Sequence, residues 1–259
     1  MKKAVKILAF VLAAVMLTAA LAGCGGKSGS SSLKTVEAGK LYMATNAAFP
    51  PYEMTKDDGS GYEGIDVEIA TAIAKKLGLE LVVDDMDFTS VITSVQSGKD
   101  DMAMAGLTVN EERKQNVDFT ESYATGVQVV IVPEGSDIAS IDDLDGKMIG
   151  TQEGTTGYIY CSDDYGEDHV TAYTNGAIAV QALLSGSVDC VIIDNEPAKA
   201  FVAQNEGLKI LETEYVVEDY AIGISKDNPE LLKAVNDALK ELIADGSVQK
   251  IIDKYISAE

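Results

Sequence analysis

Arg113 is the residue whose type and setting point most directly to chemistry. The chain holds 19 lysines but this single arginine. A planar guanidinium can hold a carboxylate through two parallel hydrogen bonds, whereas an ammonium acts as a point charge. Arg113 follows the apolar segment 102–107 closely enough to point back over its end. A surface arginine beside Glu111 and Glu112 is the alternative that the sequence leaves open.

Asp194 ends another apolar segment, residues 188–193. With Arg113 it would match a free amino acid, which carries a carboxylate and an ammonium on one carbon. Charged hydrogen bonds contribute about 1.5–3 kcal/mol each, so three or four would reach micromolar affinity after association costs. Asp194 can also be the N-cap of a helix that follows it. Hydroxyl and backbone groups must complete such a site, and three threonines are candidates: Thr108, Thr155 and Thr156.

Two phenylalanines are candidates for the walls of the site. Phe49 precedes Pro50 and Pro51 on a stiff loop after the first predicted strand, and Phe88 precedes a short predicted helix. The chain has five phenylalanines and no tryptophan, so a phenylalanine on a loop is informative. Packing in the core is an equal alternative for Phe88.

Other kinds of chemistry find little support. One histidine and no cysteine cluster argue against a zinc site. No nucleophile motif appears, nor any glycine loop that would cradle a phosphate. We therefore expect no metal, no cofactor, no catalytic residue and no ATP hydrolysis. Cys161 and Cys190 could pair in an oxidising environment, but Cys190 lies in an apolar run, where a buried thiol is commoner.

Short β-rich runs alternate with helical patterns, which predicts α/β layers built on parallel strands. Several predicted helices end at a glycine, as helices commonly do. The expected strands are 40–45, 79–83, 102–107, 127–132 and 188–193, and the expected helices are 65–77, 89–95, 177–184, 231–242 and 248–256.

An internal repeat organises these elements. In both 95–101 and 183–189, a helix ends at Ser-Gly, and an aspartate and a buried strand follow. Two similar α/β lobes would bring the ends of these strands together, where ligands of open α/β sheets bind. This places residues 106–108 on one wall and Asp194 on the other. Ser-Gly is also a frequent helix end, so chance is the alternative.

The N-terminus indicates export. Basic residues precede an apolar run at 7–21, which is about 15 residues and too short to span a bilayer. The run ends in Leu21-Ala22-Gly23-Cys24, which resembles the lipobox of bacterial lipoproteins. That resemblance implies removal of residues 1–23 and a lipid-modified Cys24, with acyl chains such as palmitate that anchor the chain at the extracytoplasmic face of the membrane. A secreted protein with a chance cysteine is the alternative.

Residues 24–36 include a Gly/Ser tract and are expected to form a flexible tether. Removal of the signal peptide would leave 17 basic and 42 acidic residues, a formal charge of −25. Such a surface repels phosphate backbones, so we expect no nucleic-acid partner. We expect a monomer.

From about Lys40 to Tyr255 the chain resembles the polar-amino-acid-binding receptors of ABC importers, the bacterial extracellular solute-binding proteins of family 3. The resemblance rests on stretches that are spread in the right order over the chain: Ala48-Phe49-Pro50-Pro51-Tyr52, Gly64-Ile65-Asp66-Val67-Glu68, Ala105 to Arg113, Val117 to Tyr123, Gly146-Lys147, Gln152 to Thr156, and Asp189 with Asp194.

The resemblance implies a periplasmic-binding-protein type II fold, with two α/β lobes joined by two hinge strands. Lobe 1 would comprise 37–126 and 222–259, and lobe 2 would comprise 127–221. Arg113 would bind the α-carboxylate of the ligand and Asp194 its α-ammonium. The other residues expected in the site are Asn46, Phe49, Tyr52, Phe88, Ala105, Gly106, Thr108, Gln152, Thr155 and Thr156.

Two positions depart from the family pattern. Asn110 stands where many relatives carry threonine. Asn46 stands where relatives that prefer lysine, arginine or histidine tend to place aspartate. The missing charge at Asn46 favours a neutral, polar amino acid.

We expect capture by hinge closure and delivery to ABC permease subunits that work with a cytoplasmic ATPase. Two alternatives remain open. An enzyme on the same scaffold, similar to cyclohexadienyl dehydratases, would need a general acid such as Glu53 or Glu153. A ligand-sensing partner of a signalling protein would use the same pocket.

Overall fold

The computed structural model describes residues 33–211 and 214–256. The predicted signal peptide, Cys24 and most of the tether therefore lie outside the described residues. Within the described ranges, no helix combines the length and the apolar character needed to cross a membrane.

Lobe 1 is built on a five-stranded sheet with the order β5-β1-β6-β14-β7. β1 runs parallel to β5 and β6, while β14 runs antiparallel to β6 and β7. The strands are β1 (Lys40–Thr45), β5 (Glu80–Asp85), β6 (Met102–Ala103), β7 (Val117–Phe119) and β14 (Gly223–Ser225).

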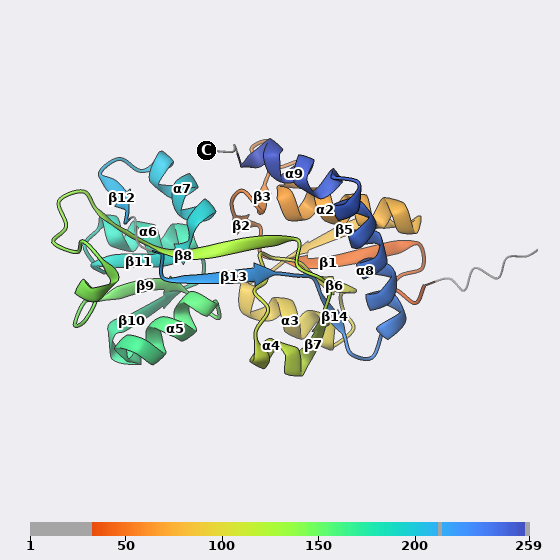
Figure 1. Ribbon diagram of the computed structural model, residues 1–259, viewed down its shortest axis with the longest axis horizontal. Helices are drawn as coiled ribbons and strands as arrows, with labels where there is room; N and C mark the ends of the chain where they lie inside the picture. Colours follow the sequence, from red (N-terminus) through yellow and green to blue (C-terminus); the bar gives the residue numbers. More distant parts are fainter. Residues whose placement is uncertain (1–32, 212–213, 257–259) are drawn as a thin grey trace, which may run out of the picture. The chain divides into compact units, whose positions relative to one another are not determined.

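Helices cover both faces of this sheet (Figure 1). Alternate residues of β1 face opposite sides, so Leu41 and Met43 pack with one set of helices and Ala44 with the other. The first set is α2 (Ile65–Leu77), α8 (Pro229–Ala244) and α9 (Ser247–Tyr255); the second is α3 (Phe88–Gln96) with α4 (Glu111–Asn116) beside it.

Lobe 2 repeats this layering on a six-stranded sheet, with the order β10-β9-β11-β8-β12 and with β13 paired to β8. Cys161 and Cys190 are buried free thiols in one apolar cluster between the sheet and α5. The strands are β8 (Ala124–Pro133), β9 (Ile149–Gln152), β10 (Val170–Tyr173), β11 (Cys190–Asp194), β12 (Leu208–Ile210) and β13 (Val216–Tyr220). The helices are α5 (Thr156–Tyr165), α6 (Gly176–Leu184) and α7 (Asn195–Gln204), with 3₁₀ turns η1 (Ile141–Asp143) and η2 (Glu167–His169).

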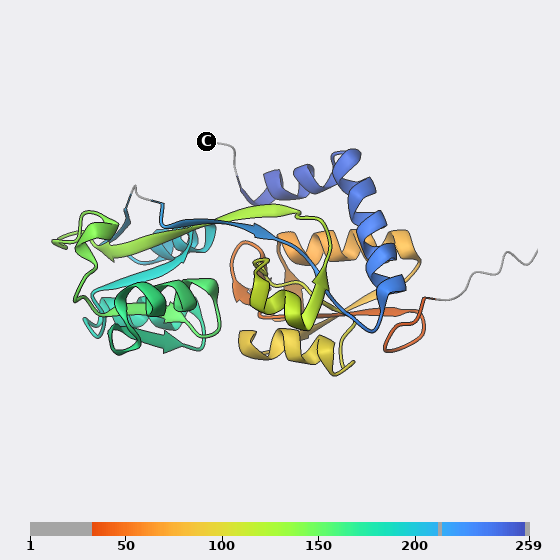
Figure 2. The same ribbon diagram turned by 60° about the horizontal axis from the view of Figure 1, so that its bottom comes forward.

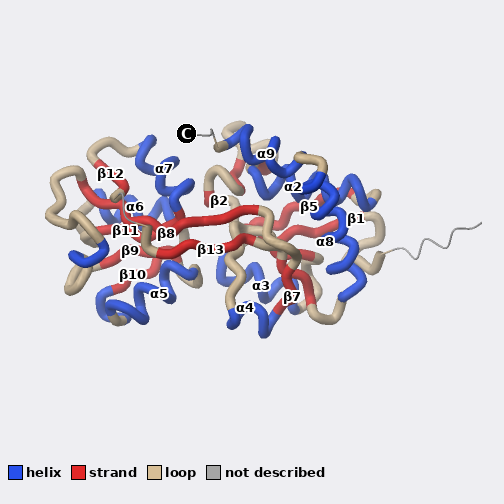
Figure 3. The backbone as a smooth tube through the Cα atoms, in the orientation of Figure 1, coloured by secondary structure: helices blue, strands red, loops and turns tan. Residues whose placement is uncertain are grey.

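Two strands link the lobes. β8 and β13 pair antiparallel from Val216 and Gln128 to Tyr220 and Ala124, and they extend side by side from lobe 2 to lobe 1 (Figures 1 and 3). At the lobe 1 end, Tyr220 bridges to Thr108. The predicted boundary at 126/127 falls inside β8 and that at 221/222 falls just after β13. The division of the chain at these exact residues stays a prediction.

The internal repeat has a structural reason. Gly98 and Gly186 end α3 and α6 in the left-handed conformation. Three residues later, Asp101 accepts a hydrogen bond of 2.8 Å from the backbone N–H of Tyr42, and Asp189 accepts one of 2.7 Å from that of Met148. Each aspartate thus holds the start of the adjacent parallel strand, β1 or β9.

A small antiparallel sheet carries part of the site: β2 (Ala48–Phe49), β3 (Glu53–Thr55) and β4 (Tyr62–Glu63). Phe49 pairs with Glu53 in this register, so both side chains lie on one face. The first N–H groups of α2 donate to the carbonyl groups of Pro51 and Tyr52. The small sheet is therefore fixed to the N-terminus of α2; Figure 2 shows it beside that helix.

Two sequence expectations were wrong in part. The segment 102–107 is a regular strand only at Met102–Ala103, because Gly106 has a left-handed backbone and its N–H donates to the carboxylate of Asp66. The sheets are mixed rather than parallel, because β14 in lobe 1 and β8 in lobe 2 run against their neighbours. β8 is one of the two connecting strands, and β14 follows directly after the other, β13.

Gly64 is expected to be required for the attachment of α2. Its φ is +128°, and a Cβ there would lie 2.2 Å from the carbonyl oxygen of Tyr52. Gly64→Ala should lower the free energy of unfolding by clearly more than Gly78→Ala. At Gly78 a Cβ meets nothing within 4 Å, and only the left-handed backbone, costing about 1–2 kcal/mol, is strained. Urea denaturation measures both, and equal losses would contradict this account.

Candidate ligand-binding site

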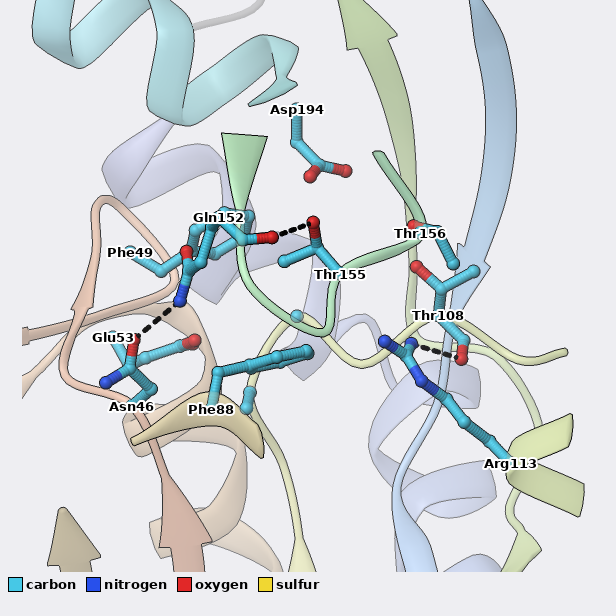
Figure 4. Close-up of a pocket in the computed structure, with 12 residues that line it drawn as sticks. Asn46, Phe49, Glu53, Phe88, Thr108, Arg113, Gln152, Thr155, Thr156 and Asp194 are labelled. Atoms are coloured by element: carbon cyan, nitrogen blue, oxygen red, sulfur yellow. Dashed lines mark hydrogen bonds between the residues drawn. The ribbon is translucent and has the colours of Figure 1, made fainter. Parts of the chain in front are cut away.

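A pocket with an empty volume of about 320 Å³ lies between the lobes. Figure 4 shows residues of both lobes around it, with Arg113 and Asp194 at separate positions on the wall. Of the twelve residues expected in the site, eleven line this pocket, and Glu53 lines it as well. The eleven are Asn46, Phe49, Phe88, Ala105, Gly106, Thr108, Arg113, Gln152, Thr155, Thr156 and Asp194.

Tyr52 is the expected residue that does not line the pocket. Its side chain is 2% exposed and packs edge-to-face on Tyr220, with ring centroids 5.2 Å apart. Tyr52 therefore supports the wall from behind. Phe49, its stacked neighbour, lines the pocket directly and covers Gly106, where a Cβ would lie 2.7 Å from the Phe49 ring.

Arg113 is positioned by its own helix and by both lobes. Asn110 caps α4 by accepting the backbone N–H of Arg113 at 2.8 Å. The guanidinium donates to the carbonyl oxygen of Thr108 at 2.8 Å and, across the cleft, to that of Gly154 at 3.2 Å. It also lies 5.3 Å from the centre of the Phe88 ring. Burial lowers the pKa of Arg113, and nearby acidic groups oppose that shift.

The N-terminus of α5 opens onto the same pocket. Thr155 is its N-cap and accepts the backbone N–H of Tyr158 at 3.3 Å, while its hydroxyl donates to the Gln152 carbonyl oxygen at 2.8 Å. The first N–H groups of a helix have no partner within the helix and favour a negative charge. Arg113 and the start of α5 at Thr156 can therefore hold a carboxylate between them.

Asp194 is 6% exposed and lies at the end of β11. It begins α7 but makes no side-chain cap, because its carboxylate instead accepts hydrogen bonds from Tyr220 and, at 2.9 Å, from Gln128. Burial raises the pKa of Asp194 to about 7, Glu218 adds to the rise, and the bonds from Tyr220 and Gln128 oppose it. An ammonium group would favour the ionised form.

Glu218 on β13 is buried and accepts hydrogen bonds from Thr108 and Thr156, which line the pocket, and from Gln128. Its Oε2 accepts the hydroxyl of Thr156 at 2.9 Å, the amide of Gln128 at 2.9 Å and the hydroxyl of Thr108 at 3.3 Å. Because the hydroxyl groups of Thr108 and Thr156 both donate their hydrogen bonds to Glu218, their oxygens have only lone pairs left for the pocket. Their oxygens are thus prepared to accept from a ligand ammonium, not to donate to a carboxylate.

The opposite end of the pocket is formed by Asn46, Gln152 and Glu53. Asn46 donates to the carbonyl oxygen of Met86 at 2.8 Å and accepts the Gln152 amide at 3.0 Å, so this second contact also joins the lobes. Glu53 is fully buried. Glu153, the other acid considered as a proton donor, is exposed and does not line the pocket.

Sequence reasoning missed Glu218, Gln128 and Tyr220 as members of the site. Glu218 and Tyr220 are buried at alternate positions of β13, and the residue between them is exposed. That alternation was the available signal, but the acidic residues of the segment made it look unlike a strand. Gln128 lies within the apolar run of β8, where a polar residue at 1% exposure needs partners.

Two mixed α/β lobes, two linking strands and a pocket between the lobes define a type II periplasmic binding protein. The chain belongs to the bacterial extracellular solute-binding proteins, family 3, whose model matches residues 41–258.

Curated and solved relatives agree with this class. The arginine-binding extracellular protein ArtP of Bacillus subtilis is 34% identical over 260 residues, covering 96% of this chain and 97% of the relative. A solved ancestral arginine-binding protein bound to glutamine is 40% identical, with a TM-score of 0.80, covering 86% of this chain and 100% of that one. A solved substrate-binding protein of an amino acid ABC transporter is 36% identical, also with a TM-score of 0.80, covering 85% and 100%.

The buried carboxyl of Asp194 should make the stability of the empty protein depend on pH. Its pKa of about 7 exceeds the ordinary 3.8, so the folded state binds a proton that the unfolded state lacks between these values. The free energy of unfolding should therefore fall as pH rises from about 4 to 7. Urea denaturation over this range should show a smaller fall for Asp194→Asn. An equal slope in both proteins would contradict the assignment.

Proposed function

We infer that this chain captures a polar amino acid outside the cytoplasm and presents it to the permease of an ABC importer. The observation that carries the proposal is the meeting, in one pocket, of a buried guanidinium from lobe 1 and a buried carboxylate from lobe 2. Arg113 and the N-terminus of α5 bind the α-carboxylate of the ligand. Asp194 binds its α-ammonium, with the lone pairs of Thr108 and Thr156 as further acceptors.

Capture is coupled to closure of the lobes. Arg113 reaches Gly154 and Gln152 reaches Asn46 across the cleft, so the closed form already has two hydrogen bonds between lobes. A zwitterionic ligand adds contacts to Arg113 and Asp194 that exist together only in the closed form, and so favours closure. The β8–β13 pair is the hinge.

The preferred ligand is a neutral, polar amino acid. Asn46 places an uncharged amide at the far end of the pocket, and Gln152 adds a second amide beside it. Two amides and the Phe49 and Phe88 rings suit a side chain that both donates and accepts hydrogen bonds. Arginine is the main competitor, because two of the relatives named above are described as arginine-binding proteins.

Cys24 holds the protein at the membrane through a lipid. The tether at 24–36 then allows the body to move over the surface of the membrane and to reach its permease. As a monomer, each copy presents one pocket.

A thermal-shift screen over the standard amino acids and cystine is expected to find a ligand that raises the melting temperature. Calorimetry with that ligand should show one site. Arg113→Ala should weaken binding by at least about 100-fold, because a charged hydrogen-bond pair worth about 3 kcal/mol is lost. Arg113→Lys should restore only part of the affinity, since lysine cannot form two parallel bonds. Unchanged affinity in Arg113→Ala would rule out the role of Arg113.

Expression of the full chain in a bacterium fed labelled palmitate tests the anchor. The wild type should incorporate the label and fractionate with the membrane. Cys24→Ser should carry no label, whereas Cys161→Ser, which changes another cysteine, should keep it. Label that persists in Cys24→Ser would contradict the lipid site.

A further inference from the structure

A pair of buried carboxyl groups lies at the side-chain end of the pocket. Glu53 and Asp66 are both 0% exposed, and their carboxyl groups are close enough to share a hydrogen bond. Glu53 lines the pocket, while Asp66 stands behind it at the start of α2. Neither residue is used by the cradle for the α-carbon groups.

The hydrogen bonds of this pair are incomplete. Asp66 Oδ2 accepts the N–H of Gly106 at 2.9 Å and the hydroxyl of Tyr123 at 2.8 Å. Both oxygens of Glu53 and Oδ1 of Asp66 are buried and accept no donor from the described residues. Two adjacent carboxylates cannot both remain ionised in such a place, whereas one proton between them satisfies two of the three oxygens.

The surroundings favour retention of that proton. Asp85 on β5, Asp194 on β11 and the rings of Tyr52 and Tyr123 face the pair, and the charged groups among them are acidic. Burial is the main cause that raises the pKa of Glu53 well above its usual range, and Asp66 adds to it. Burial also raises the pKa of Asp66 to about 6, and the donors from Gly106 and Tyr123 oppose it.

We propose that Glu53 and Asp66 hold one proton between them in the empty protein, and that this proton leaves for solvent when a cationic amino-acid side chain enters the pocket. With the proton, the pair carries one negative charge and presents the remaining oxygen of Glu53, a hydrogen-bond acceptor, to a neutral side chain. Without it, two negative charges face a cation. The pair thereby sets which side-chain charge the pocket accepts at a given pH.

This inference rests on the proposed amino-acid binding and adds a consequence for selectivity. A neutral ligand leaves the pair protonated, so its affinity does not depend on this proton. A cationic ligand must displace the proton, so its affinity should rise by up to tenfold for each pH unit while the pair is protonated. Asp194 binds the ammonium of either ligand, and its own titration cancels when the two affinities are compared as a ratio.

The test is calorimetry of the purified protein with glutamine and with arginine, in phosphate and in Tris buffer. The difference between the binding enthalpies measured in the two buffers, divided by the difference between the ionisation enthalpies of the buffers, gives the number of protons released. Arginine should release about one proton more than glutamine. From pH 6 to 8 the ratio of arginine affinity to glutamine affinity should rise by more than about tenfold. Glu53→Gln should abolish the extra proton and flatten the ratio, whereas Glu153→Gln, an exposed matched control, should change neither.

The following results would overturn either the shared proton or the proposed function. Equal proton release for the two ligands in the wild type, or a constant affinity ratio, overturns the shared proton without any need for a variant. Arginine that fails to bind up to pH 9 while glutamine binds overturns it too. If no amino acid of the thermal-shift screen binds the wild type, the proposed function itself fails.

Discussion

One buried guanidinium, that of Arg113, joins the two lobes across the pocket. Removing a guanidinium from water is costly unless its N–H groups find acceptors. Arg113 finds one acceptor in each lobe, the carbonyl oxygens of Thr108 and Gly154, so its solvation by the protein requires the lobes to be together. Phe88 covers the guanidinium, and Asn110 fixes the helix that carries it. A ligand carboxylate would give the guanidinium a negatively charged acceptor, whereas the two carbonyl groups that it bonds now are neutral.

Acidic groups outnumber this cation around the pocket. Asp194, Glu218, Glu53 and Asp66 are all buried, and Arg113 is the one cation among the residues that line the pocket. Hydrogen bonds stabilise part of this excess, such as those from Gln128 to both Asp194 and Glu218, whereas the oxygens of Glu53 accept no donor from the described residues. This excess of acidic groups beside one guanidinium would suit a ligand that carries both an ammonium and a carboxylate, as the proposed amino acid does.

The topology brings these groups to one place. β8 and β13 pass between the lobes, and Gln128, Glu218 and Tyr220 lie on these two strands. Tyr220 lies against Tyr52, bonds Asp194 and bridges to Thr108, so the hinge strands contact both walls. The two linking strands therefore contribute side chains to the site as well as joining the lobes.

The sequence by itself determined the residues whose chemistry is unusual for their setting. A lone arginine, an aspartate at a strand end and glycines at helix ends follow from composition and local periodicity, and the repeat around Asp101 and Asp189 indicated two lobes. Tertiary structure alone decided how far strand 102–107 extends, that Tyr52 stands behind the wall, that Glu53 lines the pocket, and that Glu218 bonds Thr108 and Thr156. These outcomes depend on contacts between residues far apart in the sequence, such as Thr108 with Glu218, which are 110 positions apart, and Tyr52 with Tyr220. Local sequence patterns carry no record of such distances, because hydrogen-bond partners and desolvation are set only when the layers pack.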